Sequence, residues 1–140
     1  MIKVKIYSVG KTKELWLEQA LEEYFKRLTG QMEISCLWAK NDEQLVQLVE
    51  KEGVVICLDP QGKQFNSVEF SKFLQKKIES SGARLTFVIG GADGLPPLFK
   101  EKYPLISLSR LTFTHQLTRL VLIEQIYRAF TLIQGIPYHK

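Results

Sequence analysis

The sequence predicts an α/β fold, with one mainly parallel sheet and helices on both of its faces. Strand-like and helix-like segments alternate along the chain, and two short segments, residues 54–58 and 85–89, are almost wholly apolar. Such runs are typical of parallel strands that helices cover on both sides. No repeat, low-complexity stretch or linker interrupts the 140 residues, so we expect one domain spanning residues 1–140.

The first half of the chain alternates strand and helix. Leucines and aromatic residues recur at helical spacing after Thr12, which suits an N-cap, and Gly30 follows the end of that helix. The expected elements are a strand at 2–9, a helix at 13–28, a strand at 32–39, a helix at 42–52, a strand at 54–58 and a turn at 59–63.

The second half repeats this alternation and ends in a long helix. The expected elements are a helix capped by Ser67 and running to about residue 81, a strand at 85–89, a loop at 90–94, a helix at 97–102, a strand at 103–108 and a helix at 116–134. The last helix is apolar over an arc wider than the roughly 100° that one core face needs. We therefore expect a second buried surface there, most simply a contact between two copies of the chain.

Composition narrows the class of protein. A net charge of +4 and a pI near 9.1 are compatible with a polyanionic partner, although many basic proteins have none. Cys36 and Cys57 both lie in apolar runs and are expected to be buried, unpaired thiols. No run approaches the roughly 18 apolar residues of a membrane span, and the N-terminus lacks a signal-peptide core. We expect a cytoplasmic protein.

Three inner strands are predicted to end near Asp59, Gly90 and Ser109. In open α/β sheets ligands bind beyond the carboxyl ends of the strands, so these loops would line one crevice if the strands are neighbours. The glycine-rich loop 90–94 fits a tight turn or a close approach of the backbone to a ligand. It has neither the dinucleotide-binding spacing nor a P-loop ending, which argues against NAD and ATP.

Single residues in these loops leave alternatives open. Asp59 and Asp93 could each belong to a turn or face the crevice, and His115 could be a cap, a core group or a catalytic base. Glu124 and Arg128 stand at i, i+4, which fits a surface ion pair or a carboxylate that orients an arginine towards an anion. His139 has no companion at metal-ligand spacing, so no metal site is expected.

Several motifs, in order, together resemble the RlmH/YbeA-type family of the SPOUT methyltransferase class. The resemblance covers nearly the whole chain. One departure is Thr114, where the family usually has proline before the histidine. The matching stretches are Val9-Gly10-Lys11, Leu58-Asp59-x-x-Gly62-Lys63, Ile89-Gly90-Gly91-x-x-Gly94, Leu108-Ser109-x-Leu111-Thr112-Phe113-x-His115, Leu122-Ile123-Glu124-Gln125-Ile126-Tyr127-Arg128-Ala129 and Gly135-x-Pro137-Tyr138-His139-Lys140.

The resemblance implies a single SPOUT-type domain whose C-terminal segment forms a trefoil knot. It implies homodimers packed through the last helix, and methylation of N3 of a pseudouridine in 23S ribosomal RNA of assembled 70S ribosomes. The methyl donor would be S-adenosylmethionine. The family's cofactor contacts fall on Leu58, Gly90, Leu108, Ser109, Arg110, Leu111, Thr112 and Phe113.

The expected catalytic and RNA-binding groups are concentrated near the C-terminus. We expect Arg128, Tyr138, His139 and Lys140 to grip the target nucleotide and its phosphates, and His115 to shape the cofactor loop. Asp93, His115 and His139 are the ionisable candidates for removing the proton of the target nitrogen, and the sequence does not rank them.

Three other functions compete with this one. The chain could be a SPOUT enzyme acting on tRNA or on a ribose 2′-hydroxyl, or a ribosome-associated binding protein without turnover. It could also be a generic nucleotide-binding module, against which the missing phosphate loop speaks.

Overall fold

The computed structural model describes residues 1–10 and 14–138. Within these ranges five strands and five helices alternate, as the sequence predicts. In chain order they are β1 (Ile2–Val9), α1 (Leu15–Arg27), β2 (Met32–Ala39), α2 (Asp42–Val49), β3 (Val55–Gln64), α3 (Ser67–Ser80), β4 (Arg84–Ile89), α4 (Pro97–Lys102), β5 (Leu105–Ser107) and α5 (His115–Gln134).

The strands form one sheet in the order β2-β1-β4-β3-β5, and every described pairing is parallel. The mainly parallel sheet is therefore confirmed. The three strands whose ends were expected to meet, β4, β3 and β5, are direct neighbours. Their carboxyl ends lie at the same edge of the sheet, where a ligand crevice is expected.

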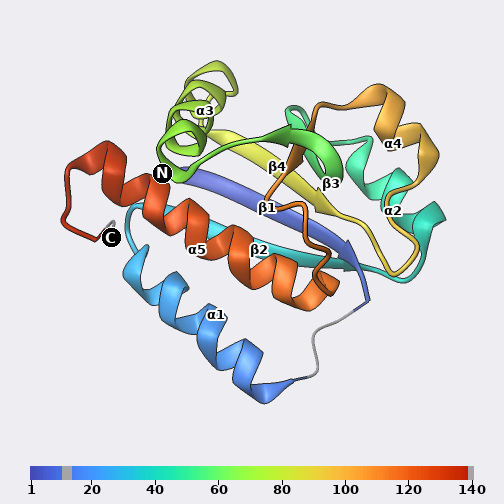
Figure 1. Ribbon diagram of the computed structural model, residues 1–140, viewed down its shortest axis with the longest axis horizontal. Helices are drawn as coiled ribbons and strands as arrows, with labels where there is room; N and C mark the ends of the chain where they lie inside the picture. Colours follow the sequence, from blue (N-terminus) through green and yellow to red (C-terminus); the bar gives the residue numbers. More distant parts are fainter. Residues whose placement is uncertain (11–13, 139–140) are drawn as a thin grey trace.

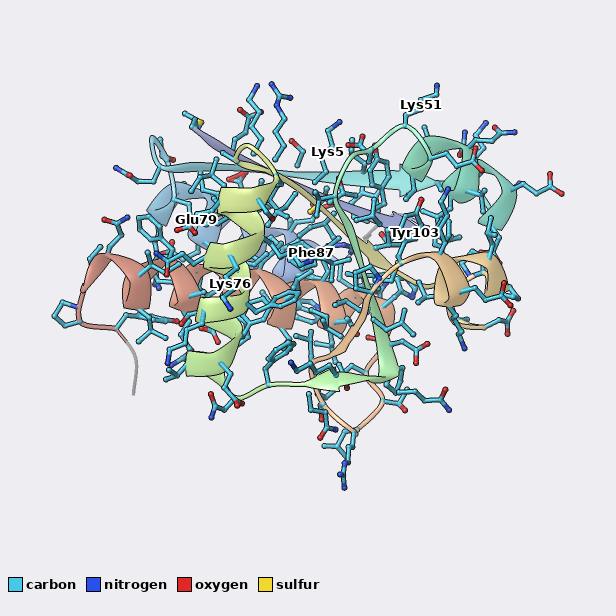
Figure 2. All side chains as sticks on the ribbon, turned by 90° about the horizontal axis from the view of Figure 1, so that it is seen from above. Lys5, Lys51, Lys76, Glu79, Phe87 and Tyr103 are labelled. Carbon is cyan, nitrogen blue, oxygen red and sulfur yellow. The ribbon has the colours of Figure 1, made fainter. Side chains whose placement is uncertain are left out.

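Helices cover both faces of this sheet, as predicted. α1, α5 and α3 lie side by side on one face, with α5 between the other two (Figure 1). They enclose the larger apolar core, which includes Phe87 of β4, labelled in Figure 2. α2 and α4 cover the opposite face over a smaller core that includes Leu45, Val88 and Phe99. All three of these side chains are fully buried, which explains why the two inner strands are apolar on both faces.

The starts of two helices differ from their predicted positions. α1 begins after Glu14 rather than at residue 13, and the expected cap Thr12 lies outside the described residues. α3 is capped by Asn66 instead of Ser67, since the Asn66 side chain accepts from the amide of Glu69 and the Glu69 carboxylate accepts from the amide of Asn66. This reciprocal pair satisfies two helix-end donors at once.

The predicted turn at 59–63 is instead a bulge inside β3. Leu58 and Lys63 both pair with Ile106 of β5, so the residues between them loop out of the ladder. An ideal Cβ on Gly62 would lie 2.6 Å from the Ile106 backbone, so only glycine lets the two strands approach this closely. The bulge places Asp59 and Pro60 beyond the sheet edge, towards the ends of β4 and β5.

A half-buried carboxylate fixes the opposite end of the sheet. Glu52, which follows α2, accepts hydrogen bonds from Lys5 Nζ at 2.8 Å, Tyr7 Oη at 3.0 Å and Thr86 Oγ1 at 3.2 Å. Burial opposes ionisation of Glu52, but these donors outweigh it and hold the pKa of the carboxyl below its usual value. The cluster ties the segment after α2 to β1 and β4.

Both cysteines are free, as expected, but only Cys57 is fully buried, whereas Cys36 is half-buried. Burial raises their pKa values to about 11 for Cys36 and about 12 for Cys57. Among the described residues no helix is long and apolar enough to cross a bilayer.

Candidate active site

A cavity of about 610 Å³ opens where β3, β4 and β5 end and α5 begins. It brings together three segments that lie far apart in the sequence: the bulge of β3, the glycine loop after β4 and the loop between β5 and α5. A volume of this size suits a small-molecule cofactor. The lining residues are Leu58, Asp59, Pro60, Ile89, Gly90, Gly91, Ala92, Gly94, Leu95, Ser107, Leu108, Ser109, Leu111, Thr112, Phe113, Thr114, His115, Gln116 and Thr118.

Most residues expected to contact a cofactor lie at this cavity. Arg110 is the exception, since its side chain is exposed and does not line the cavity. The loop around it is held by short bonds, in which Ser107 Oγ donates to the Ser109 carbonyl at 2.9 Å and the Leu111 amide donates to Ser109 Oγ at 3.0 Å. The expected residues that do line it are Leu58, Gly90, Leu108, Ser109, Leu111, Thr112 and Phe113.

The glycine loop after β4 combines both roles that the sequence left open. Gly94 has a φ of +85° and its amide donates to the Gly91 carbonyl at 3.0 Å, which makes a tight turn. Gly90 lies against this turn, because a Cβ there would come within 2.5 Å of the Gly94 backbone. The loop therefore brings bare backbone to the wall of the cavity.

The cavity wall is mainly apolar and carries no cationic side chain among its described residues. Its carboxylate, Asp59, is buried, accepts from the Gln61 amide at 2.8 Å and lies 3.5 Å from Lys100 Nζ. The wall offers a phosphorylated cofactor no arginine or lysine side chain to pair with its phosphates. It suits an apolar or positively charged ligand held by backbone groups.

The first turn of α5 contributes residues that the sequence did not single out. Gln116 and Thr118 line the cavity, and Gln116 Nε2 donates to both carboxylate oxygens of Glu14 at 3.0 and 3.2 Å. Thr114 caps α5 by accepting from the Leu117 amide at 3.3 Å. Its φ of −59° is close to the angle that proline would fix, so the threonine preserves the backbone that the family's proline provides.

The two described candidates for a base occupy different places. His115 lines the cavity, whereas Asp93 lines a neighbouring hollow on the other side of the glycine loop, next to Lys40 and Asn41. His139 lies outside the described residues. Of these groups, the structure places only His115 at the cavity of its own chain.

The expected RNA-binding groups form a separate cluster at the far end of α5. Arg128 and Glu124 are ion-paired at 3.2 Å, and Tyr138 Oη donates to Glu124 Oε2 at 3.0 Å. The Arg128 guanidinium lies 5.1 Å from the centroid of the Tyr138 ring, which in turn packs edge-on against Tyr127. Burial and the hydrogen bond to Glu124 raise the pKa of Tyr138. Glu124 therefore fixes the positions of both Arg128 and Tyr138.

Distance separates this cluster from the cavity. Arg128 follows His115 by 13 positions on one continuous helix, which corresponds to about 20 Å at the α-helical rise. Neither Arg128 nor Tyr138 lines the cavity of its own chain. Lys140, like His139, lies outside the described residues.

A buried arginine anchors the cavity end of α5. Arg119 is fully buried, donates to Ser8 Oγ and lies 4.0 Å above the Trp38 ring. Burial lowers its pKa to about 10. The contacts join α5 to β1 and β2, immediately next to Thr118 at the cavity wall.

Comparisons with known proteins agree with this architecture. The sequence profile described as "Predicted SPOUT methyltransferase" matches residues 2–139. The chain is 56% identical over 140 residues to a ribosomal RNA large subunit methyltransferase H of Protochlamydia amoebophila, with all of both chains covered. It is 40% identical to the protein of the same name from Enterococcus faecalis, which covers 99% of this chain and 100% of the relative.

Solved structures show the same fold at low sequence identity. A probable methylase family protein from Haemophilus influenzae matches with a TM-score of 0.59 at 12% identity, covering 98% of this chain and 70% of its own. A structure described under 2-OH methylation of C/U34 on tRNA matches with a TM-score of 0.51 at 9% identity, covering 96% and 98%. With a family profile that spans nearly every residue and full-length relatives at up to 56% identity, the chain belongs to the SPOUT methyltransferase family, in the branch of the ribosomal RNA large subunit methyltransferase H enzymes.

Proposed function

We propose that this protein transfers a methyl group from S-adenosylmethionine to N3 of a pseudouridine in 23S ribosomal RNA of the assembled 70S ribosome, in the cytoplasm. The observation that carries the proposal is the cavity at the ends of β3, β4 and β5, which contains seven of the eight expected cofactor contacts. The full-length relatives named for methylation of large-subunit ribosomal RNA support the choice of substrate.

The chemistry of the cavity fits this cofactor. Leu58, Gly90 and the segment 108–113 would hold S-adenosylmethionine, whose sulfonium supplies an activated methyl group when bound. A wall free of cations does not repel a positively charged ligand, and the backbone of the glycine loop offers polar groups without side-chain bulk. The trefoil knot implied by the family resemblance is part of this proposal.

A second copy of the chain would complete the site. Arg128 and Tyr138 lie about 20 Å along α5 from His115 of the same chain. Antiparallel packing of two α5 helices would bring this end of one helix to the cavity of the other. The outward side of α5 offers apolar contact for such a dimer, since Leu117 is 40% exposed and Leu120 and Val121 are half-buried. Arg128, Tyr138, His139 and Lys140 would then face the RNA bound at the partner's cavity.

The chain's own groups would then divide the work. Alignment of the target nitrogen with the donor would provide much of the rate enhancement. Arg128, held in place by Glu124, would neutralise charge on a phosphate or a uracil oxygen, and Tyr138 would stack on a base. His115 at the cavity wall and His139 on the tail are the candidates for taking up the proton, whereas Asp93 faces the neighbouring hollow.

The test is methyl transfer from tritiated S-adenosylmethionine to defined acceptors. Assembled 70S ribosomes, free 50S subunits, protein-free ribosomal RNA and tRNA would be taken from a strain lacking the activity. We expect label in large-subunit RNA of 70S particles, mapping to N3 of a pseudouridine. Label only in tRNA would mean that the acceptor is tRNA and not ribosomal RNA. Cofactor binding without any label would indicate a ribosome-associated binding protein.

Complementation between inactive variants tests the shared site. An Arg128→Ala chain and a chain with a blocked cavity, Gly90→Val, should each be inactive. Mixed after unfolding and refolding together, they should regain activity, because a heterodimer would combine one intact cavity with one intact Arg128. No recovery in heterodimers that are shown to form would contradict the shared site.

A further inference from the structure

A basic surface borders the cavity on the side of α3. Between Gly62 and the end of α3 at Ser80 the chain carries four lysines and two carboxylates, and one of these, Glu69, already caps α3 through the Asn66 amide. Figure 2 looks onto this helix, with Lys76 on it. We call this surface the α3 basic strip and define it by Lys63, Lys72, Lys76 and Lys77.

Two of its ammonium groups lie over aromatic rings rather than beside carboxylates. Lys63 Nζ lies 5.3 Å from the centroid of the Phe65 ring, and Lys77 Nζ lies 5.6 Å from that of Phe73. The two rings are 5.0 Å apart, so both lysines lie over one pair of contacting rings. Within the described residues neither lysine pairs with a carboxylate, so their N–H donors remain available to an anionic ligand.

The strip begins at the cavity. Lys63 pairs with Ile106 and Gln64 with Ser107 of β5, and Ser107 lines the cavity. From there the strip continues along α3, whose 14 residues extend about 20 Å. A nucleic acid strand with one nucleotide at the cavity mouth could therefore extend along the strip.

The other flank of α5 has the opposite charge. α1 lies across α5 from α3 (Figure 1), and residues 14–27 carry four carboxylates against Lys26 and Arg27. A polyanion is therefore attracted to the α3 side of the cavity and repelled from the α1 side. This difference in charge between the two flanks of α5 would orient a bound polyanion towards α3. Evenly scattered surface lysines would not orient it.

We infer that the α3 basic strip binds the phosphate backbone of the acceptor RNA next to its target nucleotide. The inference rests on the proposed function for the identity of the RNA, but it concerns a surface outside the methyl-transfer site. The strip provides affinity and orientation, while the cavity and the C-terminal cluster carry out the reaction.

The test removes two charges from the strip and compares a control with the same change in charge. The test variant is Lys63→Gln with Lys77→Gln, and the control is Lys26→Gln with Lys51→Gln, two exposed lysines outside the strip. Binding to 70S ribosomes and to protein-free ribosomal RNA is measured by fluorescence anisotropy over a series of salt concentrations. S-adenosylmethionine binding by calorimetry checks that the cavity is intact.

We expect the test variant to bind both acceptors about tenfold more weakly at 0.1 M salt, with a salt dependence lowered by about two phosphate contacts. Its kcat at saturating ribosomes and its cofactor affinity should match the wild type. Unchanged affinity and salt dependence would overturn the inference, as would an equal loss in the control. A loss with 70S ribosomes but none with protein-free RNA would assign the strip to a ribosomal protein and also overturn it.

Binding is measured here without methyl transfer, so the two proposals can fail separately. If the test variant loses RNA binding but the wild type methylates no acceptor, the proposed reaction is contradicted and the inference about the strip stands. If the wild type methylates 70S ribosomes and the test variant binds them equally well, the inference about the strip is overturned and the proposed reaction stands.

Discussion

Replacing Gly90 with alanine tests whether the glycine loop forms a wall of the cavity. An ideal Cβ at this position would lie 2.5 Å from the carbonyl carbon of Gly94 and 2.6 Å from the amide nitrogen of Leu95. Ordinary contact begins near 3.4 Å, so the loop would have to move by about 1 Å. Both obstructing atoms belong to the backbone and cannot rotate away as a side chain can.

The expected effects of Gly90→Ala follow from this displacement. Overpacking of this kind costs about 1–3 kcal/mol, which for a domain of this size lowers Tm by about 4–12 °C. The loop also lines the cavity, so affinity for S-adenosylmethionine should fall at least about tenfold, because displaced backbone groups no longer meet the ligand. Thermal unfolding and titration calorimetry measure the two quantities independently.

A matched glycine supplies the control. No atom lies within 4 Å of a Cβ built on Gly53, so Gly53→Ala should change the free energy of unfolding by less than about 0.5 kcal/mol and leave cofactor affinity unchanged. A Gly90→Ala protein with wild-type Tm and wild-type affinity would refute the close approach of Gly90 to Gly94. A lower Tm with unchanged affinity for S-adenosylmethionine would show that the glycine loop does not contact the cofactor.

Three further substitutions and one deletion test other parts of the molecule. Glu52→Gln removes a carboxylate that accepts from three side chains, so urea denaturation at pH 7 should show a loss of about 1–3 kcal/mol. Because the folded protein lowers the pKa of Glu52, this difference should shrink as the pH falls below about 4. Arg119→Lys keeps the charge but loses the guanidinium plane over Trp38, and thermal unfolding should show a loss of about 1–3 kcal/mol. Arg128→Ala and, separately, deletion of residues 138–140 should keep calorimetric binding of S-adenosylmethionine and lose methylation of 70S ribosomes.

Each of these has an outcome that contradicts its reasoning. The stabilising effect of ionised Glu52 is fully present above its unfolded pKa of about 4.3 and is lost as the pH falls through the lower folded pKa. A Glu52→Gln loss that is the same at pH 3 and pH 7 would therefore exclude the charge as its cause. Wild-type stability of Arg119→Lys would show that the guanidinium contact with Trp38 does not stabilise the fold. Full activity of Arg128→Ala or of the chain lacking residues 138–140 would show that the changed residues do not take part in methyl transfer.

Local sequence patterns were enough to predict most of the fold. The apolar runs at 54–58 and 85–89 predicted inner parallel strands, and the structure places them in β3 and β4 at the centre of the sheet. Helix ends were less predictable, because Asn66 and Ser67 are both good caps and only the reciprocal bond with Glu69 decides between them. The bulge of β3 was missed, since a turn and a bulge share the same Gly- and Pro-containing composition.

The candidate site was predicted in part. The sequence identified the three loops at the strand ends, and parallel topology alone makes such loops meet at one edge. It could not show that Arg110 faces away from the cavity, because one position in a loop does not fix the direction of its side chain. Nor could it show that the cluster of Arg128 and Tyr138 lies far from His115 in its own chain.

The sequence by itself determined the alternation of strands and helices, the family, and the three strand-end loops that supply most of the cavity. These depend on local periodicity and on the order of motifs, and both can be read directly from the sequence. The tertiary structure alone decided the strand order, the side of the glycine loop that Asp93 occupies, and the 5.0 Å contact that joins Phe65 to Phe73 beneath two lysines. Such features depend on packing between segments distant in the chain, where burial and charge act through space and not along the sequence.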